Sequence, residues 1–312
     1  MSPATRQRAW FAWSLVCVIW GTTYLAIKIA LESIPPFLMG GIRYVIAGAI
    51  LAVWLKATGR PLPLRGSLAR LAVLGFFMLT LGNGGVVWGE QYLSSGLTAV
   101  VIATTPFWMV GVDAGLGGDR LRLRQVIGLA VGLSGIVILV WPDLALGGNT
   151  RQVLWGILAL QIACCGWAIA SSYTRRHVVS SDVMGAASLQ MLFGGGFLVL
   201  LGLLVGEAPA LSFTPRTTTA LVYLILAGSL VAFAAYSYAL RHLPVAVVSL
   251  YTYINPVIAV ALGTLLLGEP FHVSMLIGGA VIAIGILIVR PRAGCRTSAE
   301  LSGVAAASTR AR

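Results

Sequence analysis

The side chains with chemical potential are mostly aromatic rings and amides that lie inside long apolar runs. Those expected to line a binding site are Trp20, Asn83, Trp108, Trp167, Tyr236, Tyr251, Tyr253 and Asn255. Aromatic rings can hold amphipathic solutes by stacking and by cation–π contact with an ammonium group, worth about 0.5–2 kcal/mol. The other role open to each tryptophan is packing, or anchoring at the membrane–water interface. Trp20 and Trp167 fall near the middle of their runs, which favours solute binding.

Two basic residues, Arg43 and Lys28, also lie inside apolar runs. A charge near the bilayer centre costs about 2.5–3.5 kcal/mol on insertion scales, so each needs a partner or a function. Arg43 can bind a substrate carboxylate or pair with Glu90. Lys28, nearer the end of its run, can pair with Glu32 or extend to the interface. No proton-relay carboxylate is expected at the midplane, so the sequence shows no proton coupling, and facilitated export or exchange fits as well.

Two prolines, Pro106 and Pro256, interrupt apolar runs. A proline inside a helix removes one hydrogen bond and frees the carbonyl four residues earlier, here that of Ile102 or Thr252. A freed carbonyl is costly in lipid, so both regions are expected to face protein or a wet cavity. The prolines are then either gating bends that flex during transport or static kinks.

Motifs for enzymatic chemistry are absent from the sequence. There is no Walker A loop, HExxH or G-x-S-x-G pattern, and His177, His242 and His272 fall at the ends of expected spans. The four cysteines lack metal-ligand spacing. We therefore expect no enzyme, no catalytic residue, no cofactor and no metal.

The composition indicates an integral membrane protein. Of 312 residues, 58% are hydrophobic and 10% are charged, and mean hydropathy is +0.93. A soluble chain carries about 25% charged residues, so a large soluble domain is excluded. The net charge of +12 resides in short gaps between apolar runs. It is therefore read as a topology signal rather than a nucleic-acid surface.

Ten apolar runs predict an all-α polytopic protein with ten transmembrane helices. They lie near residues 9–31, 36–55, 68–89, 94–117, 125–141, 153–174, 183–205, 217–240, 245–267 and 272–289. The first run continues without a small-residue cleavage site, so we expect it to be retained as a span. If the N-terminus is cytoplasmic, seventeen Lys and Arg residues flank the spans inside and two outside. This imbalance predicts that both termini are cytoplasmic.

The two halves of the chain resemble each other. With shifts of 147 and 150 residues, the matched pairs include Cys17 and Cys164, Trp20 and Trp167, Pro106 and Pro256, and Gly135 and Gly285. We predict a first repeat at residues 1–145, a second at 146–290, and a disordered tail at 291–312. Because each repeat has five spans, the second must start on the opposite side of the membrane. Such inverted repeats are typical of secondary transporters, with the substrate near the midplane.

Several motifs resemble one known family. They are Trp20-Gly21-Thr22-Thr23-Tyr24, Arg43-Tyr44, Ala47-Gly48, Thr105-Pro106-Phe107, Tyr253-Ile254-Asn255-Pro256-Val257 and Leu267-Gly268-Glu269-Pro270. Over about residues 10–290 the chain resembles the EamA family of the drug/metabolite transporter superfamily, most closely its bacterial amino-acid and metabolite exporters, including aromatic amino-acid exporters. The resemblance implies a central cavity lined by spans one, three, four, six, eight and nine.

We therefore expect a secondary transporter in the bacterial inner membrane that exports small amphipathic metabolites, amino acids foremost, by alternating access. The expected partners are a small-molecule substrate and the lipid bilayer, with no nucleic acid, and the expected state is a monomer. Multidrug or quaternary-cation efflux is the alternative, and it calls for a midplane carboxylate. A membrane-embedded enzyme would need clustered His, Asp or Glu. A non-transporting scaffold would leave the mid-span aromatic residues and prolines unexplained.

Overall fold

The computed structural model describes residues 3–60, 62, 65–116, 123–145, 150–176, 183–243 and 251–289. Every regular element in these ranges is a helix, in agreement with the expected all-α class. The first two helices are α1 (Pro3–Ala30) and α2 (Pro36–Ala57). Pro36 occupies the first turn of α2, where a missing N–H costs nothing and the fixed φ favours a helical start.

Two of the membrane-length segments contain a π-helical stretch. A short 3-10 turn, η1 (Arg65–Ser67), leads into α3 (Leu68–Gly75), the π-helical η2 (Phe76–Asn83) and α4 (Gly84–Gly89). In the second half, η3 (Ala208–Ala210) precedes α10 (Pro215–Tyr223), the π-helical η4 (Leu224–Val231) and α11 (Ala232–His242). Each π-helical stretch has eight residues, and they lie at equivalent places in the two halves. The sequence analysis did not predict them.

The segment that follows α4 is broken into two helices. α5 (Ser95–Ile102) is followed by its C-cap residue Ala103, and α6 (Thr105–Gly115) begins after Thr104. Pro106 lies in the first turn of α6, so the break falls where the sequence predicted a bend. At the other end of α5, the side chain of the N-cap residue Ser94 accepts a hydrogen bond from Leu97 N at 3.2 Å.

The remaining helices are longer and mostly uninterrupted. They are α7 (Leu123–Ala145), α8 (Thr150–Arg176), α9 (Val183–Leu204), α13 (Tyr251–Leu267) and α14 (Val273–Val289). Pro256 lies inside α13 without ending the helix. The tail expected at residues 291–312 lies outside the described residues.

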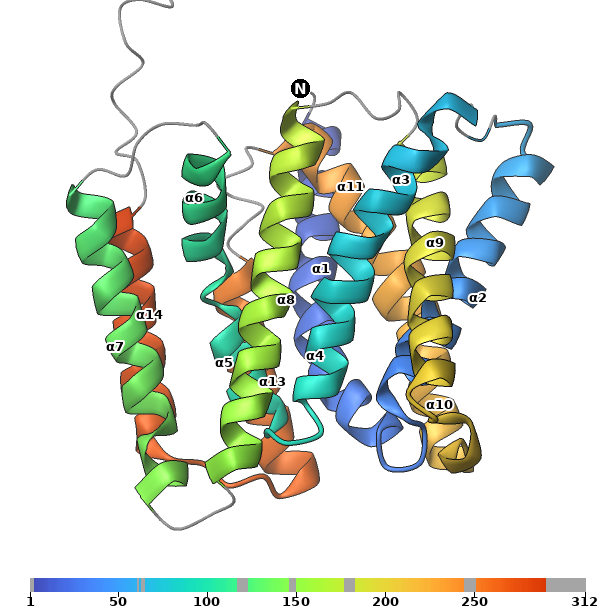
Figure 1. Cartoon of the computed structure of the whole chain (residues 1–312). Helices are drawn as coiled ribbons and strands as arrows, with labels where there is room; N and C mark the ends of the chain where they lie inside the picture. Colours follow the sequence, from blue (N-terminus) through green and yellow to red (C-terminus); the bar gives the residue numbers. More distant parts are fainter. Residues whose placement is uncertain are drawn as a thin grey trace, which may run out of the picture.

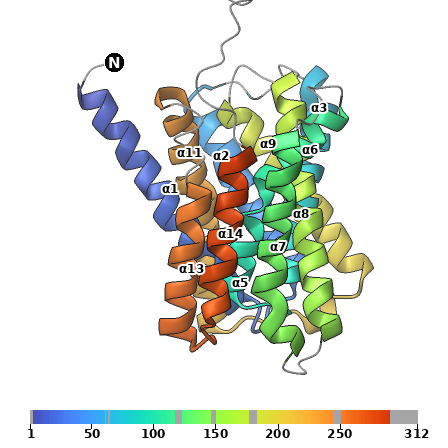
Figure 2. The same cartoon turned by 90° about the vertical axis from the view of Figure 1, so that its left-hand side faces the viewer.

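The helices run side by side along one direction (Figure 1), and α1 is inclined relative to the others (Figure 2). α7 packs on α14 at one edge of the bundle, and α2 packs on α9 toward the other. Glycines permit both contacts. A Cβ at Gly285 would lie 2.7 Å from Gly128 O, and a Cβ at Gly41 would lie 2.7 Å from Val199 N. Small residues at such faces let the backbones approach closely.

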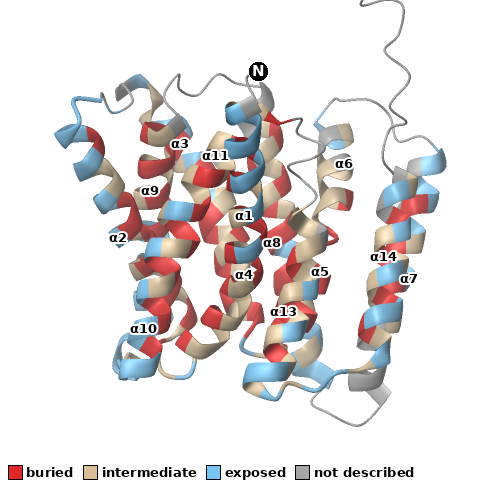
Figure 3. Cartoon of the chain, turned by 180° about the vertical axis from the view of Figure 1, so that it is seen from behind, coloured by how far each residue is buried: buried red, intermediate tan, exposed pale blue. Residues whose placement is uncertain are grey.

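The surface of the bundle is that of a membrane protein. Six helices are long and apolar enough to cross a bilayer, and four more apolar helices are shorter. Large apolar side chains such as Val53, Leu204 and Leu265 are 68%, 75% and 78% exposed. Exposed and buried residues alternate around the outer helices (Figure 3). Apolar exposure on this scale is stable against lipid tails and costly in water.

Candidate functional site

A cavity lies in the interior of the bundle and receives side chains from both halves of the chain. The space free of atoms inside it and at its open mouth amounts to about 1070 Å³. Of the residues predicted to bind solute, the cavity is lined by Trp20, Arg43, Asn83, Trp167, Tyr251 and Asn255. Most of the predicted site residues are therefore brought together in one place.

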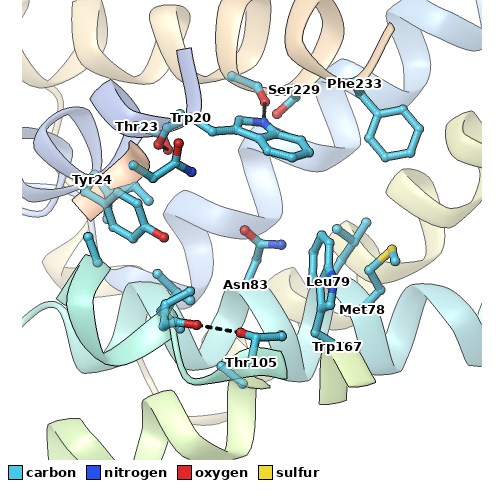
Figure 4. Close-up of a pocket in the computed structure, with 18 of the residues that line it drawn as sticks. Trp20, Thr23, Tyr24, Met78, Leu79, Asn83, Thr105, Trp167, Ser229 and Phe233 are labelled. Atoms are coloured by element: carbon cyan, nitrogen blue, oxygen red, sulfur yellow. Dashed lines mark hydrogen bonds between the residues drawn. The ribbon is translucent and has the colours of Figure 1, made fainter. Parts of the chain in front are cut away.

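Aromatic rings form much of the cavity wall. Figure 4 shows Trp20 and Trp167 on opposite sides of the cavity, with the Asn83 side chain between them. The Trp20 ring packs against the Tyr251 ring at 4.9 Å between centroids, and its Nε1 donates to Gly228 O at 3.2 Å. Contacts with α13 and η4 thus hold Trp20 in place, and its ring forms part of the cavity wall.

Arg43 brings the positive charge to the cavity. It is only 4% exposed, its Nε donates to Ser229 Oγ at 2.9 Å, and its guanidinium lies 4.8 Å from the Tyr44 ring centroid. Ser229 is its only hydrogen-bond acceptor among the described residues, so the pairing with Glu90 that the sequence allowed is not formed. Gly228 makes room for Arg43, since a Cβ there would lie 3.1 Å from Nη2.

Both π-helical stretches contribute to the cavity. η2 supplies Met78, Leu79, Gly82 and Asn83, while η4 supplies Gly228 and Ser229. A π turn displaces the backbone register by one residue, and such turns occur frequently at functional sites. Here they place an amide, a hydroxyl and a glycine carbonyl at the level of the two tryptophans.

At the break before Pro106, neighbouring hydroxyl groups donate hydrogen bonds to the backbone carbonyls. Ile102 O, the carbonyl expected to be freed, accepts a hydrogen bond from Thr105 Oγ1 at 2.6 Å. This is the dashed line in Figure 4. Thr104 Oγ1 donates to Val101 O at 2.7 Å. Thr105, not Pro106, lines the cavity.

Pro256 acts differently, because α13 continues through it. It borders an apolar groove between α5, α13 and α14 rather than the cavity. The preceding Asn255 donates from its side-chain amide to Tyr251 O at 3.0 Å and to Cys17 O at 3.1 Å. The amide thereby joins the proline-containing turn of α13 to α1.

Two predicted residues, Trp108 and Tyr236, do not line the cavity. Trp108 donates from Nε1 to Gln161 Oε1 at 2.8 Å, which ties α6 to α8 about one turn beyond Thr105. Tyr236 lies behind the wall, with its ring 5.2 Å from that of Trp20. The side chain of Tyr253 is outside the described part of the structure.

The structure adds cavity residues that sequence reasoning missed. These are chiefly Thr23, Tyr24, Thr105, Ser229, Phe233 and Cys164. Tyr24 had a usable signal, because it lies one helical turn after Trp20 and therefore on the same face. Ser229 had none. Within the described lining Arg43 is the only charged residue, and no described cluster of His, Cys, Asp or Glu could hold a metal ion.

Lys28 also departs from expectation. Its Nζ donates to the carbonyls of Glu90 and Leu93, each at 2.7 Å. Glu32, its expected partner, instead pairs with Arg216 at 3.1 Å. Lys28 thus points into the protein, toward the loop after α4, while Glu32 remains at the surface.

Comparison with known proteins agrees with this architecture. The model of the EamA-like transporter family matches residues 8–141 and again 154–290, and the chain belongs to this family. It is 35% identical to the uncharacterized inner membrane transporter YedA of Escherichia coli K12, over 87% of both chains. It is 22% identical to the uncharacterized transporter YoaV of Bacillus subtilis, over 88% of this chain and 93% of that one.

The fold is also known from experiment. A crystal structure of a protein 22% identical in sequence superposes with a TM-score of 0.62 and covers 90% of this chain and 95% of the other. Together with the apolar helices, the family and its inner-membrane relative identify the protein as a multi-pass transporter of the bacterial inner membrane.

Proposed function

We propose that the protein is a secondary transporter that exports small amphipathic metabolites, with amino acids, aromatic ones included, as its substrates. The observation that carries the proposal is the pairing of Arg43 with aromatic walls in one cavity lined by both halves of the chain. A guanidinium binds a carboxylate through charge-assisted hydrogen bonds. The faces of Trp20 and Trp167 suit an aromatic or apolar side chain and attract an ammonium group.

In this proposal the chain crosses the membrane ten times, in two inverted repeats of five spans each, and both termini are cytoplasmic. Transport proceeds by alternating access between the two repeats. Three observations support this arrangement. The family model matches twice, and the π-helical stretches recur at equivalent places in the two halves. Helices at the same position in the two repeats also pack on each other: α2 packs on α9, and α7 packs on α14. Inverted repeats can exchange conformations around a fixed central site.

Efflux of quaternary cations is the second candidate. The aromatic walls favour it, because cations bind to aromatic faces. Arg43 opposes it, because the described lining contains this positive charge and no carboxylate to offset it. Amino acids and related carboxylates therefore fit the cavity better.

The test is counterflow in proteoliposomes with a panel of radiolabelled amino acids and cationic drugs. Trp167→Ala removes a cavity wall, and Trp155→Ala on the same helix is the matched control, because Trp155 is 47% exposed on the outer surface. We expect wild-type counterflow of one amino-acid class, lost in Trp167→Ala and kept in Trp155→Ala. Counterflow of cations alone would replace the proposal with drug efflux. Equal loss of counterflow in both variants would contradict the assignment of the cavity as the substrate site.

A further inference from the structure

Glu90, the residue after α4, is the most isolated acidic group among those described. Its side chain is completely buried, and neither carboxylate oxygen has a hydrogen-bond partner in the part of the chain that the structure describes. It lies immediately beyond the apolar span Leu68–Gly89. One helical turn earlier, Val86 lines the solute cavity. A sealed carboxyl group therefore lies next to the proposed solute site, at one end of it.

Among the described groups that face Glu90, only one carries a positive charge. Lys28 of α1 is close enough to act electrostatically on Glu90, yet its Nζ is engaged by the carbonyls of Glu90 and Leu93. Tyr24 of α1 and Glu269 of the loop between α13 and α14 are the other titratable neighbours. From α8, glycine and apolar residues pack against α4, including Gly156, Ala159 and Leu160.

Glu269 fastens the same end of the bundle. Its Oε2 accepts hydrogen bonds from Ser95 Oγ at 2.7 Å and Ser95 N at 3.0 Å, at the start of α5. Gly263 of α13 leaves space for this contact, since a Cβ there would collide with Glu269. Lys28 and Glu269 thus hold the loop after α4 and the start of α5 from two sides. Leu93 and Leu97 are buried beneath them.

An ionised Glu90 would not be stable in this arrangement. A buried carboxylate without hydrogen bonds carries a large desolvation cost, and protonation removes that cost. Burial raises the pKa of Glu90 well above its ordinary value; the Lys28 ammonium lowers it, and the nearby Glu269 carboxylate raises it further. The neutral acid is the form that fits the closed end.

We propose that Glu90 is a proton-binding site, occupied while this end of the cavity is closed and emptied when it opens. Ionisation of Glu90 would draw Lys28 from the carbonyls of Glu90 and Leu93 and would repel Glu269 from the start of α5. Both effects loosen the closure. Proton binding and closure favour each other reciprocally, as linkage requires.

The sign of the pH dependence follows from this linkage. Because the closed end holds the proton more tightly than the open end, low pH stabilises the closed form. Closure weakens as pH rises through the raised pKa of Glu90. If the protein is the transporter proposed above, proton binding at Glu90 couples solute transport to the proton. This coupling rests on the proposed function.

Infrared difference spectroscopy tests the proton site without any solute. Spectra of the reconstituted protein at two pH values should show the C=O stretch of a protonated carboxylic acid that ionises as pH rises. We expect this band to disappear in Glu90→Gln and to persist in Glu32→Gln, which removes an exposed acid at the same end. Lys28→Gln should keep the band and move its midpoint upward by about one pH unit, because a neighbouring positive charge is lost.

If the band remains in Glu90→Gln, or is absent from the wild type, Glu90 is not the proton-binding site. This conclusion does not depend on which solute the protein transports. Coupling is tested separately by counterflow at several pH values. Wild type and Glu32→Gln should be pH-dependent, and Glu90→Gln should be active and insensitive to pH. If Glu90→Gln has the infrared defect and keeps the wild-type pH profile, proton coupling is wrong while the solute site stands.

Discussion

Arg43 on α2 donates from Nε to Ser229 Oγ in the π-helical stretch η4, at 2.9 Å. The bond joins the first half of the chain to the second at the cavity wall. It occupies Nε, while no described residue accepts a hydrogen bond from the terminal nitrogens of the guanidinium. The terminal nitrogens are the ones that bind a carboxylate with paired hydrogen bonds. Ser229 therefore orients Arg43 without competing with a solute.

Gly228→Ala tests this orientation. The added Cβ would lie 3.0 Å from Thr23 Cγ2 and 3.1 Å from Arg43 Nη2, so Arg43 must move. We expect a rise in KM for the transported amino acid of about tenfold, equivalent to about 1.4 kcal/mol. The control is Gly196→Ala, because no atom lies within 4 Å of a Cβ at that glycine. Kinetics that are the same in both variants would show that the position of Arg43 does not matter.

Glu269→Gln tests the closure of the cavity end. The variant keeps the shape of the side chain and removes the charge that strengthens its bonds to Ser95 Oγ and the backbone N–H of Ser95 and Gly96. Hydrogen bonds to charged groups contribute about 1.5–3 kcal/mol. We expect a lower Tm in detergent than for Glu32→Gln, which loses a surface ion pair worth at most about 1 kcal/mol. An unchanged Tm would mean that Glu269 does not stabilise the closed end.

Gly285→Val tests the packing of α7 on α14. Its Cβ would lie 2.7 Å from Gly128 O and 2.8 Å from Gly132 N, both backbone atoms that cannot move independently. We expect poor insertion or a strongly lowered Tm. Gly279→Val on the same helix is the comparison, because a Cβ there has its nearest neighbour at 3.8 Å. Comparable stability of the two variants would contradict the close contact.

Much of the architecture follows from local sequence. The apolar runs expected at 36–55 and 68–89 coincide with α2 and with the segment from α3 to α4. Pro106 marked the break between α5 and α6, because proline removes one helical hydrogen bond and disfavours a continuous helix. Pro256 has the same effect on hydrogen bonding, yet α13 continues through it. Trp20 and Trp167 were placed together by their equivalent positions in the two halves, and both line the cavity.

Other features depend on contacts between distant segments. The π-helical stretches carry no residue signature, since packing decides where a helix gains an extra residue per turn. The isolation of Glu90 depends on where Lys28 and Glu269 lie, and sequence spacing does not show this. Trp108 has the residue type of a cavity aromatic, yet Gln161 on α8 offers its indole a hydrogen-bond acceptor.

The most direct test of the account compares three related solutes in proteoliposomes: an aromatic amino acid, its decarboxylated amine and its deaminated acid. If Arg43 binds the carboxylate, the wild type should exchange the amino acid and not the amine. Arg43→Gln should lose about 10–100-fold in affinity for the amino acid, since charge-assisted hydrogen bonds contribute about 1.5–3 kcal/mol. The deaminated acid should compete in the wild type. Equal exchange of amine and amino acid, unchanged in Arg43→Gln, would contradict the account.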